Sequence, residues 1–206
     1  MHRLPAGSWC VYYTESAFSY ISLFKFLTLP YRIIMTHRNL LLFFSAALLF
    51  LAGCAKNYPY LETVPNVDLN RYMGTWYEIA SLPNSFQEGC NCSKAEYTLV
   101  EDEVKVLNTC RKDSLNGELD DAEGIATIVE GSNNAKLKVS FFWPFKGDYW
   151  IIDLADDYSY AVVGTPSRKY LWVLSRTKTL PDSVYSPILQ RAAAKGFDIS
   201  KVNKAT

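Results

Sequence analysis

The amino-acid sequence predicts an all-β protein: an eight-stranded antiparallel up-and-down β-barrel with one C-terminal α-helix packed outside. Three observations predict this fold. From about residue 74, apolar and polar residues alternate with the period of two that is typical of half-buried strands. Short turn segments divide this part of the chain into eight such runs, and one later segment, residues 181–195, has helical spacing instead. Closing eight antiparallel strands into a barrel would pair both edge strands.

Each predicted strand is an alternating run bounded by turn residues. In residues 136–143, Leu137, Val139 and Phe141 share one face, so this apolar face is expected inside the barrel. The sixth run is apolar on both faces, which favours a position between the barrel interior and the helix. The eight predicted strands span residues 74–82, 94–100, 103–110, 120–129, 136–143, 148–154, 159–164 and 170–176.

The helical segment repeats its apolar residues at Val184, Ile188, Leu189 and Ala192. Asp182 or Ser183 can cap its start, and Gly196 can end it. Pro187 is awkward inside a helix, because proline lacks the backbone N–H donor. Either the helix kinks there, or Ser186 is the N-cap and Pro187 the first helical residue.

The N-terminal region resembles an export signal. Residues 35–38 form a short, positively charged segment. As a helix, the apolar run of residues 40–52 would reach roughly 20 Å, which is too short to cross a bilayer core of roughly 30 Å. The run ends in Leu-Ala-Gly before Cys54, which is similar to a bacterial lipoprotein box. This similarity implies a signal peptide at residues 35–53 and lipidation of Cys54 as the first mature residue.

The remaining parts of the chain follow from that assignment. Residues 1–34 are interpreted as upstream sequence read in frame, the alternative being a membrane-associating extension. Residues 54–70 are expected to form a tether and residues 71–206 the barrel domain. The whole chain has a formal net charge of zero. The part from Cys54 on is near −3, because residues 1–53 hold four Lys/Arg and one Asp/Glu. This charge balance does not favour binding to nucleic acid.

Three motifs in order resemble the lipocalin family, specifically bacterial outer-membrane lipoprotein lipocalins and their relative apolipoprotein D. They are GTWYE at residues 74–78, DYSYA at residues 157–161 and LWVLSR at residues 171–176. Residues 138–154 and the lipoprotein box are similar to the bacterial branch. The resemblance covers residues 71–201, nearly all of the chain after the signal. It gives Gly74, Trp76, Asp157, Tyr158 and Arg176 structural roles.

The first and last motifs also have a physical reading. Trp76 would point inward and plug one end of the barrel, and Gly74 would let the chain enter tightly. Along the last predicted strand, Arg176 falls on the inward-facing alternation, so its guanidinium could lie across the indole of Trp76. Such a cation–π contact is worth roughly 0.5–2 kcal/mol. We therefore interpret Trp76 and Arg176 as fold determinants rather than ligand contacts.

The barrel interior is the expected ligand site. An eight-stranded barrel has room for side chains or for one small ligand, and the resemblance implies a fatty acid or a lysophospholipid. The alternative is that the side chains fill the barrel. Phe86, Trp143 and Phe145 are expected near the mouth. Lys94, Lys112 and Lys146 could meet a carboxylate or phosphate at the rim, but we interpret them as solvated lysines. The candidate ligand-binding residues are Ala95, Tyr97, Val139, Phe141, Trp143, Tyr149 and Trp172.

The cysteines leave one alternative open. Strand pairing around the turn at residues 100–102 places Cys92 roughly opposite Cys110, whereas the family resemblance implies a disulfide between Cys90 and Cys110. Export would permit either bond. A metal site of Cys90, Cys92 and Cys110 has one ligand too few for a closed zinc site, so no metal is expected.

The leading function hypothesis is a lipid-anchored binding protein that stores or transports a hydrophobic ligand. Ala55 after Cys54 implies, by the family rule, the outer membrane, with the barrel facing the periplasm. A homodimer is plausible for such a family, and no cofactor is implied. The alternatives are a structural envelope protein with a filled barrel and, less favoured, a lipid-modifying enzyme. Both histidines, His2 and His37, precede Cys54, which excludes histidine-dependent catalysis after cleavage.

Overall fold

The computed structural model describes residues 57–205. The predictions for residues 1–34, the signal at residues 35–53 and the lipidation of Cys54 lie outside the described residues. Within residues 57–205, none of the helices has the length and apolar character needed to span a membrane.

The eight predicted strands and the single long helix are confirmed. Strand β2 begins four residues earlier than predicted and β6 three residues earlier. The short helix α2 (Leu69–Tyr72), the 3-10 turns η1 (Ser85–Gln87) and η2 (Ile199–Lys201), and β9 (Asn203–Lys204) were not predicted. The barrel strands are β1 (Gly74–Ser81), β2 (Cys90–Val100), β3 (Glu103–Lys112), β4 (Leu119–Ile128), β5 (Lys136–Phe142), β6 (Phe145–Leu154), β7 (Tyr160–Gly164) and β8 (Leu171–Ser175).

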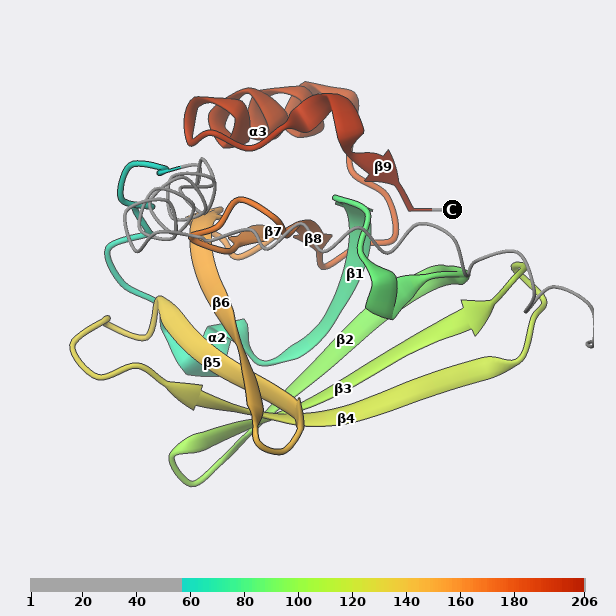
Figure 1. The fold of residues 1–206 in the computed structure, drawn as a ribbon, viewed down its shortest axis with the longest axis horizontal. Helices are drawn as coiled ribbons and strands as arrows, with labels where there is room; N and C mark the ends of the chain where they lie inside the picture. The colour runs from blue at the N-terminus through green and yellow to red at the C-terminus, as the bar shows by residue number, and fades with distance from the viewer. Residues whose placement is uncertain (1–56, 206) are drawn as a thin grey trace, which may run out of the picture. The chain divides into compact units, whose positions relative to one another are not determined.

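The sheet closes on itself through β1. Strand β1 pairs antiparallel with β2, where Trp76 lies opposite Ala95, and with β8, where Glu78 lies opposite Leu174. The remaining strands follow in sequence order from β2 to β8, and Figure 1 shows them wrapped around a common axis. Both edges of the meander are therefore paired, as the antiparallel pattern predicts.

Helix α3 (Asp182–Ala194) lies outside the barrel, beyond β7 and β8 in Figure 1. Its buried residues Tyr185, Ile188 and Ala192 pack into one apolar cluster with outer-face residues of the strands. The helix begins at Asp182 and contains Pro187 in its interior, so the alternative start at Ser186 is wrong. Its N-cap residue is Pro181, with no side-chain capping hydrogen bond, so neither Asp182 nor Ser183 caps the start. Packing of the apolar stripe outweighs the one backbone hydrogen bond that Pro187 cannot donate.

The up-and-down topology separates two ends of the barrel. The closed end carries α2 and the β2–β3, β4–β5 and β6–β7 connections. The open end carries the connections at residues 82–89, 113–118, 143–144 and 165–170.

Residues 57–68 pack along the barrel. Leu61 joins the outer apolar cluster and Val67 the inner one, and the Val64 N–H donates to the carbonyl of Ile151 at 2.9 Å. Both clusters, with the side chains packed against them, come from residues 61–202. The described chain from Asn57 on thus contains both apolar clusters, and we expect it to fold without the residues that precede it.

Candidate functional site

Trp76 seals the closed end of the barrel. Its side chain is 0% exposed, and its indole N–H donates to the carbonyl of Tyr72 at 2.8 Å. The Tyr72 ring lies 5.0 Å from the indole, centroid to centroid. The guanidinium of Arg176 lies over the indole, 3.8 Å from the ring centroid. The Trp76 ring is thus covered from several sides, and its one polar atom, the indole nitrogen, has a hydrogen-bond partner.

Arg176 also ties the entry of the chain to the last strand. Its Nη1 donates to the carbonyl of Thr75 at 2.8 Å, and its Nη2 donates to the carbonyls of Arg71 at 2.7 Å and Tyr72 at 3.1 Å. Burial lowers the pKa of Arg176. Gly74 has φ +92°, and a Cβ there would lie 3.5 Å from Nη1 of Arg176. The left-handed backbone at this point therefore favours glycine.

The second motif joins the same end to the β6–β7 turn. The Tyr158 hydroxyl accepts from the backbone N–H of Asp68 at 2.8 Å, and the guanidinium of Arg71 lies 4.0 Å from the centre of the Tyr158 ring. Asp157 accepts from the backbone N–H of Ser159 at 2.9 Å, and hydrogen bonds from Ser159 lower the pKa of Asp157. These contacts hold helix α2 across the closed end.

Five of the seven candidate ligand residues lie at the barrel interior. Ala95 and Tyr97 belong to the buried inner cluster, and Val139, Tyr149 and Trp172 pack against it. Leu137, which lies on the face expected inside, also belongs to the inner cluster. Inner-cluster residues that were not singled out from the sequence are Val104, Val106 and Ala126, for which alternation along the strand was the available signal.

The other two candidates lie toward the open end. Phe141 covers Gly124 on β4, where an added Cβ would meet its ring at 2.8 Å, and its side chain is 45% exposed. Trp143 is 84% exposed in the β5–β6 turn. It is therefore at the tip of a hairpin rather than among the interior residues.

Three tyrosine hydroxyls meet inside the barrel. The Tyr149 hydroxyl lies 2.8 Å from that of Tyr72 and 3.0 Å from that of Tyr97. Burial raises the pKa of Tyr97 to about 12 and raises the pKa values of Tyr72 and Tyr149 as well. Tyr72 was not among the residues predicted from the sequence, because it precedes the first predicted strand. The cluster forms a neutral polar patch within an apolar interior.

The raised pKa values of the three buried tyrosines predict that the folded protein loses stability at alkaline pH. Below the usual tyrosine pKa of 10.0 all three hydroxyls are protonated in both states, and the stabilising effect is fully present. As pH rises from about 10 toward 12, the unfolded chain ionises while the folded cluster stays neutral, so stability falls. Urea denaturation at a series of pH values should show this decline. A Tyr72→Phe/Tyr97→Phe/Tyr149→Phe variant should show a shallower decline, and equal slopes would contradict the assignment.

A second polar network lies at the mouth. Gln87 Oε1 accepts from the Trp172 indole N–H at 2.8 Å and from Asn84 Nδ2 at 2.8 Å, while Gln87 Nε2 donates to Glu78 at 2.6 Å. The indole can only donate and the carboxylate only accept, so both amide orientations are determined. Phe86 stacks above the same Trp172 ring at 6.4 Å. Phe86 and Trp172 were expected from the sequence, whereas the hydrogen-bonded residues Glu78, Asn84 and Gln87 were not.

A pocket of about 510 Å³ opens beside this network, where β1 separates from β2. Its walls come from the end of β1, the β1–β2 connection, the start of β2 and the C-terminal residues 203–205. Two of the candidate rim lysines carry ion pairs, Lys94 with Glu96 at 3.3 Å and Lys112 with Asp120 at 3.2 Å.

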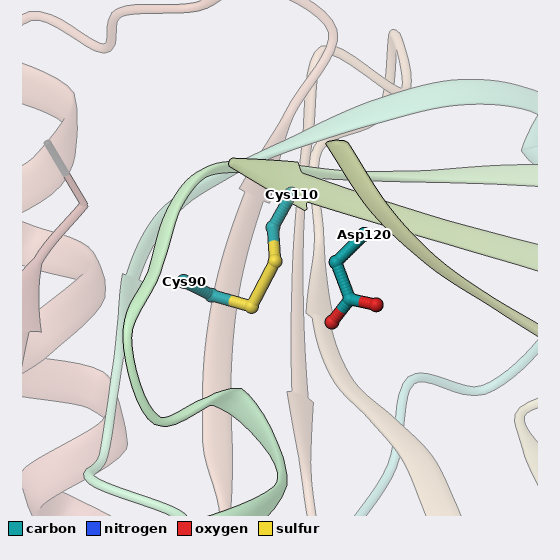
Figure 2. A group of neighbouring side chains, drawn as sticks. All are labelled: Cys90, Cys110 and Asp120. Atoms are coloured by element: carbon teal, nitrogen blue, oxygen red, sulfur yellow. A yellow bond between two sulfur atoms is a disulfide. The ribbon is translucent and has the colours of Figure 1, made fainter. Parts of the chain in front are cut away.

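The disulfide joins Cys90 to Cys110, and Cys92 is a free, exposed cysteine. The family pairing is therefore present, and the alternative between Cys92 and Cys110 is wrong. Figure 2 shows the carboxylate of Asp120 beside the two bonded sulfurs. Sulfurs in a disulfide are not thiolates, so these three side chains do not form a metal-binding set.

Comparison with known families decides what this barrel is. The chain matches the family described as "Lipocalin-like domain" over residues 67–206. The chain is a lipocalin. Lipocalins of this kind are binding proteins rather than enzymes, and the family implies a hydrophobic ligand.

Similar curated proteins come from several kingdoms. The lipocalin is 39% identical over 154 residues to "Outer membrane lipoprotein Blc" of Vibrio cholerae, covering 74% of this chain and 90% of the relative. It is 41% identical over 155 residues to "Temperature-induced lipocalin-1" of Arabidopsis thaliana, covering 70% and 81%. It is 37% identical over 147 residues to rat "Apolipoprotein D", covering 66% and 75%.

Solved structures support the same fold. Insecticyanin from the tobacco hornworm Manduca sexta matches the lipocalin with a TM-score of 0.61 at 24% identity, covering 73% of this chain and 86% of that chain. Lobster apocrustacyanin A1 matches with a TM-score of 0.55 at 19% identity, covering 66% and 78%. At these identities the likeness bears on the barrel and its helix alone.

Proposed function

We propose that this lipocalin binds the acyl chain of a fatty acid or lysophospholipid inside its barrel and stores or carries it at the outer membrane. The observation that carries the proposal is the interior itself. Apolar and aromatic side chains line a closed barrel, and two of its buried inner residues, Ala95 and Ala126, have small side chains. Each buried CH₂ contributes about 0.8 kcal/mol before ordering costs, so a long chain is the favoured guest.

The proposed ligand set combines that interior with the mouth. Ala95, Tyr97, Val139, Tyr149 and Trp172 would contact the acyl chain. Phe141 and Trp143 would contact the part of the guest that lies toward the open end. Similarity to outer membrane lipoproteins supports a lipid anchor at Cys54 with the barrel facing the periplasm.

Filling the interior should abolish this binding. An Ala126→Phe variant places a ring at a residue that is 2% exposed, among the inner cluster. We expect its affinity for hexadecanoate, measured by isothermal titration calorimetry on the chain from Asn57 on, to fall at least tenfold. The control, Thr98→Phe, adds the same ring at an exposed position on β2 and should bind as the wild type does.

The competing function is a structural envelope protein with a filled barrel. Native mass spectrometry of protein extracted with its membrane lipids separates the two. A bound acyl species supports the proposal, whereas a consistently empty barrel, together with no hexadecanoate binding, would contradict it. The same measurement gives the start of the mature chain, the acylation of Cys54 and whether one or two copies associate.

A further inference from the structure

Exposed apolar side chains gather at the open end of the barrel. Of the nine large hydrophobic side chains that are exposed in the described chain, seven lie in or beside open-end connections. Tyr60 and Val100 are the two exceptions. The seven, which we call the open-end rim, are Phe86, Leu115, Leu119, Phe141, Phe142, Trp143 and Phe145. An apolar surface confined to one end of a molecule marks an interaction site.

The β5–β6 hairpin supplies the most exposed part of this rim. Phe142, Trp143 and Phe145 are 74%, 84% and 71% exposed. The pairing of β5 with β4 ends at Ser140, and the pairing of β6 with β7 begins at Trp150. The hairpin tip therefore projects beyond both neighbouring strands. Its rings stay in water although the Phe142 and Phe145 rings stack at 6.4 Å.

We propose that the open-end rim docks onto a lipid bilayer, with the tip of the β5–β6 hairpin entering the interface. Tryptophan and phenylalanine at the end of a structured element are typical of segments that enter the interfacial region of a membrane. The rim consists of separate loop tips at several places around the mouth rather than one continuous sheet face. Such tips fit a deformable lipid surface better than the flat face of a second protein copy.

The start of the described chain lies at the same end. The Pro59 carbonyl accepts from Arg168 Nη2 at 2.7 Å, and the guanidinium of Arg168 lies 5.3 Å from the centre of the Tyr58 ring. Arg168 belongs to the open-end connection at residues 165–170 and is 6% exposed, which makes this a fixed contact. The chain thus emerges beside an open-end loop.

The position of this contact matters because Cys54 lies only three residues before Asn57. Three residues span at most about 10 Å. An acyl anchor on Cys54, as the proposed function has it, would therefore hold the membrane near the open-end side. Anchor and rim would then face the same surface, and a lipid could pass between bilayer and barrel without crossing water.

Charges near the rim indicate which bilayer it would prefer. The β3–β4 connection and the start of β4 carry the acidic residues Asp113, Glu118, Asp120 and Asp121, and Lys112 pairs with Asp120. The basic residues at this end include Arg111, Lys146 and Lys169. This mixed and partly acidic surface gives no net attraction to anionic lipids. We therefore expect binding to uncharged, zwitterionic bilayers that is insensitive to salt.

The test is co-sedimentation of the chain from Asn57 on with phosphatidylethanolamine–phosphatidylcholine vesicles. The wild type should partition onto the vesicles, and a Phe142→Ser/Trp143→Ser/Phe145→Ser variant should partition at least tenfold less. The control, Val100→Ser, removes an exposed apolar side chain at the β2–β3 connection of the closed end and should partition as the wild type does. Circular dichroism melting of all three proteins checks that each is folded.

Several outcomes would overturn the inference. One is equal partitioning of the wild type and the hairpin variant; another is an equal loss in the control. Sedimentation velocity without vesicles that shows a dimer lost only in the hairpin variant would identify a second copy as the occupant. A wild type that binds hexadecanoate but not vesicles overturns docking alone. A wild type that binds vesicles but no hexadecanoate retains docking and overturns the proposed function.

Discussion

Replacing Trp76 with alanine should lower the free energy of unfolding by about 3–5 kcal/mol, the usual range for a fully buried tryptophan. The substitution removes the packing of the indole against Tyr72 and the platform under Arg176, and it leaves a void at the closed end. It also leaves the Tyr72 carbonyl without its indole donor. Because small domains are stable by only about 5–15 kcal/mol, this loss is a large fraction of the total.

Urea denaturation of the chain from Asn57 on measures this effect. Trp143→Ala is the matched control, since it removes the same side chain from a position that is 84% exposed. We expect the control to change stability by less than about 0.5 kcal/mol. Similar losses in the two variants would show that Trp76 does not hold the closed end together.

Removing the disulfide with Cys90→Ser/Cys110→Ser should lower the free energy of unfolding by about 3 kcal/mol. The bond joins residues separated by 20 positions, and closing a loop of that length restricts the unfolded chain by about this amount. The loop contains β2, the β2–β3 turn and most of β3, so the bond secures the first hairpin of the barrel.

Cys92→Ser is the control for the disulfide, because Cys92 is exposed and unbonded. It should leave the unfolding midpoint under non-reducing conditions unchanged. A loss of stability in the control, matching that of the double variant, would instead assign the bond to Cys92. Peptide mapping of the unreduced protein gives an independent reading of the pairing.

The sequence predicted much of the candidate site because strand parity is local. Alternation alone placed Ala95, Tyr97 and Val139 on the interior face, since every second residue of a strand faces the same side. Alternation alone would also turn Trp143 inward with Val139, whereas Trp143 is exposed at the open-end hairpin, near the mouth. Parity holds only where a strand has neighbours on both sides, and the β5–β6 hairpin extends beyond them.

The polar groups of the site could not be predicted from the sequence. Tyr72, Tyr97 and Tyr149 come from α2, β2 and β6, and their hydroxyls meet only because the barrel closes. The same is true of Gln87, which connects Trp172 of β8 to Glu78 of β1. Contacts between residues distant in sequence depend on how far each strand is shifted along its neighbour, which periodicity does not specify.

By itself, therefore, the sequence determined the strands, the outer helix and the inward face of the barrel, since period and parity are properties of a local stretch of chain. Only the tertiary structure decided that Arg176 binds three carbonyls of the chain entry, that the tyrosine hydroxyls cluster and that the hairpin tip stays exposed. Those features depend on strand shift and closure, which bring distant residues together or leave them beyond the sheet.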